Sequence, residues 1–140
     1  MIVDASVILS AFFPDEEQSQ AQALIRDHVT GRVHLVAPSL LLYEVTNGVV
    51  QGTRRGRISN EQAEEILAAL EGLAIALEPV SWQQILPLAL HFDRSAYDAA
   101  YLALAQAAGQ PLVTGDRRMY NAVHDHLDWV KWIGDYRVSG

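Results

Sequence analysis

Four acidic side chains occupy positions where they could act together: Asp4, Glu44, Asp98 and Asp116. Asp4 and Asp116 follow short apolar runs, whereas Glu44 and Asp98 lie early in long apolar stretches. Four carboxylates gathered at one point would repel each other strongly unless a divalent cation joined them. The sequence has no cysteine, so oxygen ligands indicate Mg²⁺ or Mn²⁺. Such ions bind phosphate oxygens and activate water, which predicts a phosphodiesterase.

Each acid also has a purely structural explanation. Asp4 and Asp116 stand where the N-cap of a following helix is expected, and Ser95-x-x-Asp98 has the spacing of a capping box. Glu44 could mark the solvent-facing stripe of its helix, although the residues three and four positions away are uncharged. Capping explains one acid at a time. It does not explain four acids in equivalent places.

Apolar runs and helical periodicities alternate along the chain, which indicates strands alternating with helices. Strands are predicted at residues 1–3, 33–37, 74–80, 111–114 and 129–133. Helices are predicted at residues 5–13, 18–29, 38–55, 59–72, 81–92, 95–108 and 117–124, followed by a loose tail after residue 133. Short strands that are apolar throughout favour an α/β fold with a parallel sheet covered on both faces. Functional side chains then lie beyond the C-terminal ends of the strands.

The bulk composition is that of an ordinary globular protein. With 140 residues, half of them apolar, we expect a single domain over residues 1–140. The apolar runs are too short to span a bilayer and the N-terminal residues do not resemble a signal peptide, so a cytoplasmic protein is expected. The net charge of −7 argues against a general nucleic-acid binder. A carboxylate site would contribute part of that charge, and bound cations would neutralise it.

Four stretches together resemble the signature motifs of PIN-domain proteins, most closely the VapC-like toxin ribonucleases of type II toxin–antitoxin pairs. They are Ile-Val-Asp-Ala-Ser at 2–6, Pro-Ser-Leu leading to Tyr-Glu-Val at 38–45, the Ser-Ala-Tyr-Asp-Ala helix from 95 to 105, and Leu-Val-Thr-Gly-Asp at 112–116. The resemblance follows chain order over nearly the whole sequence. It implies a three-layer α/β/α sandwich with a mainly parallel sheet of about five strands.

The resemblance also carries functional expectations. It implies Mg²⁺- or Mn²⁺-dependent endonucleolytic cleavage of RNA by metal-activated water. Asp4, Glu44, Asp98 and Asp116 would be the metal-site carboxylates, with Ser6 and Thr114 in support. Members of this branch form homodimers and are inhibited by an antitoxin protein whose tail enters the acidic groove, and neither property involves a membrane.

Basic residues after the fourth acid depart from the family pattern. Relatives often carry a further acid there, where this chain has the segment from Arg117 to Asn121. The number of metal ions, one or two, therefore stays open, as does an oxygen ligand from Asn121. Arg117 and Arg118 adjoin Asp116 and are placed to touch a phosphate. By contrast, we interpret the arginines at 54, 55 and 57 as a solvated helix end.

Several other functions fit the sequence less well. A catalytically silent module could use the same acidic groove to bind a basic partner peptide, which agrees with the negative net charge. A DNA-directed flap nuclease needs a long helical arch for which the chain has no room. Receiver domains and haloacid-dehalogenase-type phosphatases need a second acid where Ala5 and Ser6 stand. Trp129 and Trp132 are interpreted as core or dimer surface.

Overall fold

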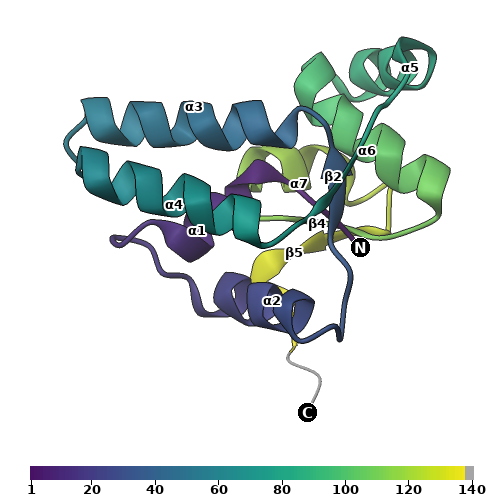
Figure 1. Ribbon diagram of the computed structural model, residues 1–140. Helices are drawn as coiled ribbons and strands as arrows, with labels where there is room; N and C mark the ends of the chain where they lie inside the picture. The colour runs from purple at the N-terminus through teal and green to yellow at the C-terminus, as the bar shows by residue number, and fades with distance from the viewer. Residues whose placement is uncertain (138–140) are drawn as a thin grey trace.

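The computed structural model describes residues 1–137, whose strands form a five-stranded parallel sheet (Figure 1). The spatial order of the strands is β3-β2-β1-β4-β5, and all neighbouring pairs are parallel. The strands are β1 (Ile2–Val3), β2 (Val36–Pro38), β3 (Ala76–Glu78), β4 (Leu112–Thr114) and β5 (Val130–Trp132). The predicted parallel sheet of about five strands is therefore confirmed.

Helices connect successive strands and cover both faces of the sheet. They are α1 (Ala5–Phe12), α2 (Ser19–Val29), α3 (Leu41–Arg54), α4 (Asn60–Gly72), α5 (Trp82–Phe92), α6 (Ala96–Ala108), α7 (Arg117–Val123) and the 3-10 helix η1 (Ile133–Asp135). The chain runs outward from β1 to β3 and then returns through α5 and α6 to β4. Right-handed crossovers in these opposite directions put α1 to α4 on one face and α5 to α7 on the other. In agreement, α6 packs on β1, β2 and β4, and α7 on β4 and β5. This is a three-layer α/β/α arrangement.

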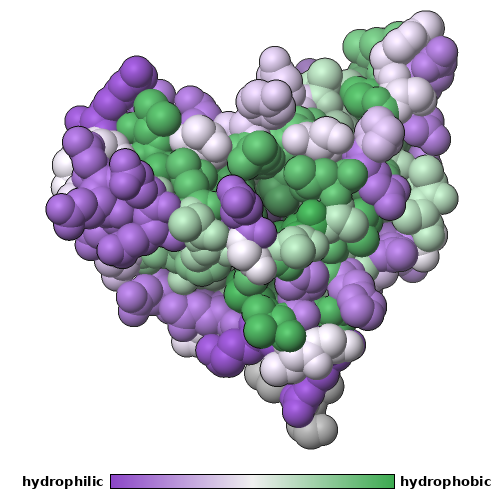
Figure 2. All heavy atoms as spheres, in the orientation of Figure 1, coloured by the Kyte–Doolittle hydropathy of each residue, from purple (hydrophilic) through white to green (hydrophobic). Residues whose placement is uncertain are grey.

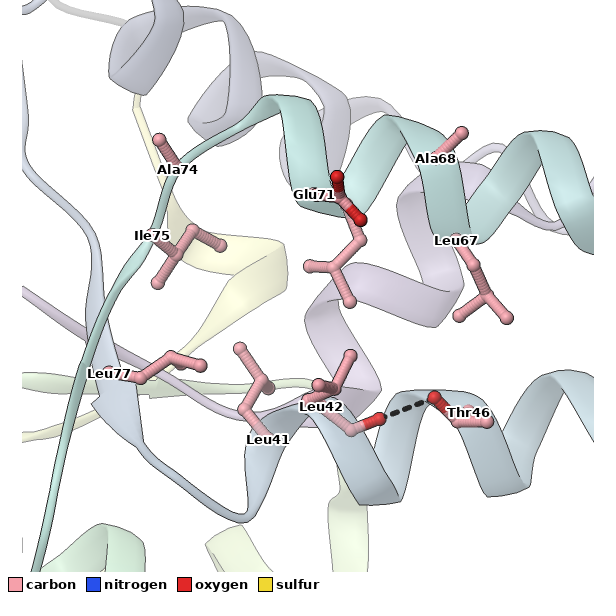
Figure 3. Close-up of a pocket in the computed structure, with 10 residues that line it drawn as sticks. Leu41, Leu42, Thr46, Leu67, Ala68, Glu71, Ala74, Ile75 and Leu77 are labelled. Atoms are coloured by element: carbon pink, nitrogen blue, oxygen red, sulfur yellow. Dashed lines mark hydrogen bonds between the residues drawn. The ribbon is translucent and has the colours of Figure 1, made fainter.

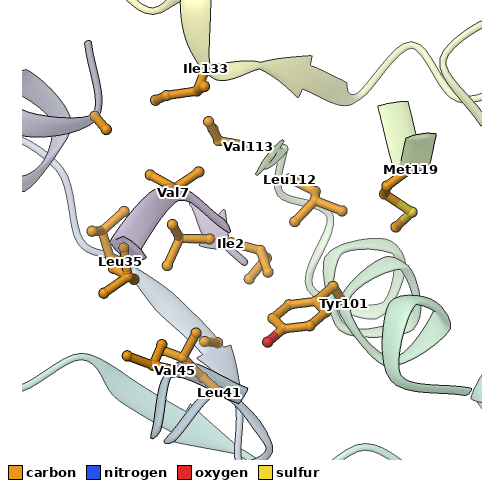
Figure 4. Packing of buried hydrophobic residues seen from close by; sticks show 14 of the residues in the cluster. Ile2, Val7, Leu35, Leu41, Val45, Tyr101, Leu112, Val113, Met119 and Ile133 are labelled. Atoms are coloured by element: carbon orange, nitrogen blue, oxygen red, sulfur yellow. The ribbon is translucent and has the colours of Figure 1, made fainter. Parts of the chain in front are cut away.

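Side chains of the central strands alternate between the two helical layers (Figure 4). Val113 of β4 lies near Val7 of α1 and Ile133, whereas Leu112 lies near Met119 of α7. All of these side chains are buried. Because both faces of the sheet are covered, its central strands can be apolar at every position, as the sequence predicted.

Two predicted strands differ from the structure. The strand predicted at 33–37 lies at Val36–Pro38, and the following helix begins at Leu41, not at Pro38. Pro38 continues the ladder in register with Glu78, and the backbone N–H of Ser39 donates to the Glu78 carbonyl. The strand predicted at 74–80 is only three residues long, Ala76–Glu78, and all three residues are exposed, because it forms the edge of the sheet.

The prediction of a loose tail after residue 133 was wrong for the residues that the structure describes. Residues 133–135 form η1, which packs against α2. The Tyr136 hydroxyl donates a hydrogen bond to the buried Asp27 of α2. Residues 138–140 of the predicted tail lie outside the described residues.

Apolar side chains line a groove between α3, α4 and the segment leading into β3 (Figures 2 and 3). Its volume is about 460 Å³. The lining residues are Leu41, Leu42, Thr46, Leu67, Ala68, Leu70, Glu71, Ala74, Ile75 and Leu77. Since Glu71 is the single titratable side chain among them, the groove offers no cluster of groups for catalysis. No helix within residues 1–137 is both long enough and apolar enough to cross a membrane.

Two glycines allow α3 to approach α1 closely. A Cβ atom at Gly52 would lie 2.7 Å from two ring carbons of Phe13, and one at Gly48 would lie 2.6 Å from a methyl group of Leu9. Phe13 is almost completely buried, so its ring has no room to move aside. Because α3 carries Glu44, this close packing also fixes one of the four acids.

Replacing Gly52 with alanine is expected to lower the free energy of unfolding by up to about 2 kcal/mol. Overpacking of the Phe13 ring by the added methyl group costs about 1–3 kcal/mol, and the gain of about 1 kcal/mol that alanine normally gives inside a helix offsets only part of it. Gly72→Ala is the matched control, since Gly72 ends α4 and a Cβ there meets no atom within 4 Å. Urea unfolding measures both changes, and equal stability of the two variants would contradict the packing argument.

Candidate metal centre at the carboxyl edge of the sheet

All four predicted acids lie at helix starts on the C-terminal edge of the sheet. Asp4 is the N-cap of α1, directly after β1, and Asp116 is the N-cap of α7, two residues after β4. Glu44 lies in the first turn of α3, which follows β2, and Asp98 lies in the first turn of α6. Strands β2, β1 and β4 are neighbours, so the loops after them meet at one edge.

Asp4 is a buried carboxylate with three hydrogen-bond donors. The Ser6 hydroxyl donates to Oδ1 at 2.5 Å and the Thr114 hydroxyl donates to Oδ2 at 2.5 Å. The backbone N–H of Val7 also donates to Oδ1, at 3.4 Å. Burial raises the pKa of Asp4 to about 6, although these hydrogen bonds oppose the shift, and the negative charge of Asp116 adds to it.

The same two hydroxyls join the turn after β1 to the turn after β4. Ser6 Oγ accepts from the backbone N–H of Gly115 at 2.8 Å, and Thr114 Oγ1 accepts from that of Asp116 at 3.0 Å. A Cβ atom at position 115 would lie 3.3 Å from Ser6 Oγ, so glycine permits this approach. Ser6 and Thr114 therefore have a defined contact: both orient Asp4 and both fix the turn that carries Asp116.

Glu44 is held by a residue that the sequence analysis did not single out. The hydroxyl of the buried Tyr101 donates to Glu44 Oε1 at 2.5 Å. Burial and this hydrogen bond raise the pKa of Tyr101, so the phenol keeps its proton and remains a donor. Tyr101 follows Asp98 by three residues, a spacing that puts both on one face of α6. That spacing is the signal that could have identified it.

Asp98 and Asp116 are half-buried, as Glu44 is, whereas Asp4 is buried. Arg94 lies 3.8 Å from Asp98 and forms an ion pair across one turn. Asp116 Oδ1 accepts from the backbone N–H groups of Arg118 and Met119 at 3.0 and 3.3 Å. Within residues 1–137, Asp116 Oδ2 accepts no hydrogen bond. This oxygen is therefore available to an external cation.

The four acids influence one another through space. Burial raises the pKa of Glu44, and repulsion from Asp98 and Asp116 adds to the effect although the Tyr101 hydrogen bond opposes it. Burial and the charge of Asp116 likewise raise the pKa of Asp98, against the attraction of Arg94. Since Asp116 also acts on Asp4, its charge reaches each of the other three. The acids therefore form one electrostatic cluster.

The donor set fits a hard divalent cation that keeps much of its water. Among the residues that the structure describes, no three His, Asp or Glu side chains are arranged so that they could hold a metal ion by themselves. Mg²⁺ does not require this, since it usually retains several waters and binds through one or two carboxylates. Burial is the largest cause of the raised pKa values of Asp4, Glu44 and Asp98, and repulsion from neighbouring carboxylates adds to each of them.

An open hollow of about 500 Å³ adjoins the cluster at Glu44. It is lined by Leu40, Tyr43, Glu44, Asn47 and Tyr97. Tyr43 and Tyr97 are among the most exposed aromatic side chains of the described chain. The hollow gives solvent and ligands access to Glu44, whereas none of the four acids lines the apolar groove between α3 and α4.

The chain belongs to the PIN-domain family, whose model matches residues 1–124. It is 33% identical over 123 residues to ribonuclease VapC3 of Pyrobaculum aerophilum, a match that covers 85% of this chain and 91% of the relative. It is 32% identical over 119 residues to ribonuclease VapC9 of Mycobacterium tuberculosis, covering 85% and 87%.

A solved structure agrees with this assignment at the level of the fold. The crystal structure of PAE2754 from Pyrobaculum aerophilum superposes with a TM-score of 0.73 and covers 95% of this chain and 83% of that one. The sequence identity is 21%, so the likeness supports the three-layer architecture alone.

Replacing Asp4 with asparagine is expected to stabilise the metal-free protein at neutral pH. Since the pKa of folded Asp4 is about 6, against 3.8 for an aspartate in the unfolded chain, the folded state binds more protons between these values. Stability therefore falls as pH rises from about 4 to about 6 and the loss persists above, by on the order of 1–3 kcal/mol. In EDTA at pH 7.5, the thermal unfolding midpoint of the Asp4→Asn variant should be higher than that of the unaltered protein. At pH 4 the two midpoints should be nearly equal. If the two midpoints differed by the same amount at both pH values, the raised pKa of Asp4 would be contradicted.

Proposed function

We propose that this chain is a Mg²⁺- or Mn²⁺-dependent endoribonuclease and the toxin of a toxin–antitoxin pair. The main support is the electrostatic cluster of Asp4, Glu44, Asp98 and Asp116 at the carboxyl edge of the sheet. The names of the relatives, ribonucleases VapC3 and VapC9, supply the substrate class.

The cluster divides into oxygens that are held and oxygens that remain open. Asp4 is fixed by Ser6 and Thr114, and Tyr101 occupies one oxygen of Glu44. The open oxygen of Asp116, with Asp98 and the second oxygen of Glu44, would bind the cation. When bound, the ion polarises the scissile phosphate and lowers the pKa of the attacking water. The side chains bind and orient; none is needed as the nucleophile.

A catalytically silent module is the second candidate. The same acidic cluster would then hold a basic peptide, as the net charge of −7 allows. The repulsion within the cluster favours the nuclease, because a small divalent ion can lie between carboxylates that a larger peptide cation would contact only from outside.

Asp98→Asn is expected to reduce RNA cleavage in Mg²⁺ by about 100-fold or more, because even groups that only orient metal ligands contribute 10–100-fold. Asp93→Asn is the matched control: it removes the same charge from an exposed residue at the end of α5. Its backbone φ of 51° is a conformation that asparagine tolerates. Cleavage of a labelled RNA, with and without EDTA, measures both. A folded, inhibitor-free protein without EDTA-sensitive cleavage would establish the binding module instead.

An antitoxin would inhibit this enzyme by covering the carboxylates. A partner tail with arginine or lysine would satisfy the charge of the cluster and exclude the metal ion. A short reading frame upstream of this gene is where its sequence should be sought. Co-purification with that partner and loss of cleavage in its presence are the observations that test the pairing.

We also propose that the chain forms a homodimer through α5. Trp82, Leu86 and Leu90 follow one another at four-residue spacing, which puts them on one face of the helix, and all three are exposed. Exposed apolar rows of this kind mark contact surfaces, and in a symmetric dimer the same face would meet its copy.

Leu90→Arg is expected to convert the dimer to a monomer, because it would bring two like charges into a symmetric apolar contact. Val29→Arg is the control, since Val29 is 67% exposed and Leu90 74%, yet Val29 lies on α2. Size-exclusion chromatography with light scattering measures the mass of each. A monomeric unaltered protein, or a dimeric Leu90→Arg variant, would contradict this interface.

A further inference from the structure

Arg117 follows Asp116 in the chain, and its side chain contacts an aromatic ring. It is the first residue of α7, directly after Asp116, and its side chain is exposed. Its guanidinium carbon lies 3.9 Å from the centroid of the Trp132 ring, a cation–π contact. Trp132 ends β5 in register with Thr114 of β4. The sheet therefore brings the ring to the place where α7 begins.

The ring itself is fixed from two other sides. Tyr120, one turn along α7, lies with its centroid 5.6 Å from that of Trp132 and stacks in turn on His124 at 4.5 Å. Gly134 approaches so closely that a Cβ atom there would lie 2.6 Å from the indole nitrogen of Trp132. Because the ring is constrained in this way, the guanidinium on it has little freedom.

The contact leaves the hydrogen-bonding edge of Arg117 available. Stacking uses the face of the guanidinium, whereas its five N–H donors point outward in the plane. Within residues 1–137, Arg117 forms no ion pair, whereas Arg57 is paired with Asp15 and Glu16. Arg118 is exposed as well, and among the residues that the structure describes it makes no cation–π contact. The Trp132 ring thus pre-orients Arg117, whereas it does not restrain Arg118.

We propose that Trp132 is a positioning residue that holds Arg117 ready to bind a backbone phosphate of the RNA, next to the phosphate at the carboxylates. This rests on the proposed function for its substrate class. A pre-oriented arginine loses less conformational entropy when it binds phosphate than a mobile one.

The test compares the affinities of a fluorescently labelled 12-nucleotide single-stranded RNA in EDTA, measured by anisotropy over a series of salt concentrations. Arg117→Ala should weaken binding roughly tenfold and lower the slope of log Kd against log salt by about 0.7. Arg118→Ala, the matched control, should change the affinity less than twofold. Trp132→Leu should reproduce most of the Arg117→Ala effect, and Trp132→Phe, which retains a ring, should restore most of the affinity.

Non-additivity is the decisive readout, because a ring that acts through Arg117 has no effect once Arg117 is gone. The Arg117→Ala/Trp132→Leu double variant should bind RNA no more weakly than Arg117→Ala alone. Independent, additive losses would overturn the proposal. So would equal effects of the two arginine variants, or a Trp132→Leu variant that is folded by circular dichroism and binds RNA normally.

This measurement is independent of catalysis. Arginine-dependent binding without any Mg²⁺-dependent cleavage would refute the nuclease and support the phosphate contact. Cleavage by the unaltered protein, with equal RNA affinity and equal KM in all variants, would support the nuclease and refute the phosphate contact. In an active enzyme, Arg117→Ala and Trp132→Leu should raise KM and leave kcat within about twofold, because the contact binds a flanking phosphate.

Discussion

The arrangement of the site depends on the hydrogen bonds of two hydroxyl groups. Ser6 and Thr114 each donate to the buried carboxylate of Asp4, and each accepts from the backbone of the turn after β4. Burying a charge without hydrogen bonds costs free energy, so the buried carboxylate of Asp4 needs these donors. The donors in turn fix the position of Asp116. One hydrogen-bond network therefore stabilises the buried carboxylate of Asp4 and also positions Asp116, although 112 positions separate the two residues in the sequence.

Helix capping and catalysis are not competing explanations of these acids. Asp4 and Asp116 both cap the helices that follow their strands. In a parallel sheet, every such cap lies at the carboxyl edge, so capping itself brings the side chains together. Capping does not require that the acids be buried close to one another. Burial is the main cause of the raised pKa values of Asp4, Glu44 and Asp98, and repulsion between the carboxylates adds to it. Retained repulsion of this kind is typical of functional sites.

The sequence allowed the elements and the four acids to be predicted because both depend on local signals. Apolar runs marked the strands, and Ser59 and Gln62 form the capping box that their spacing indicated. The contacts between distant segments left no such signal. The spacing of Tyr101 from Asp98 puts both on one face of α6, but nothing in the sequence specifies that Tyr101 pairs with Glu44, 57 residues away. The exposure of β3 was missed for a related reason: an apolar composition does not reveal which strand ends at the edge.

The net charge of −7 is a poor guide to RNA binding, because some basic side chains are neutralised by nearby acids and others are not. Arg57 is bound by Asp15 and Glu16, so this cation is cancelled locally. Within residues 1–137, Arg117 forms no ion pair and contacts the Trp132 ring close in sequence to Asp116, and the proposed divalent cations would neutralise the carboxylate cluster. A phosphate chain would therefore meet bound metal and an unpaired arginine at the carboxyl edge, whatever the sign of the distant surface. Electrostatic recognition acts over about one Debye length, roughly 8 Å at physiological salt, so the local arrangement outweighs the total charge.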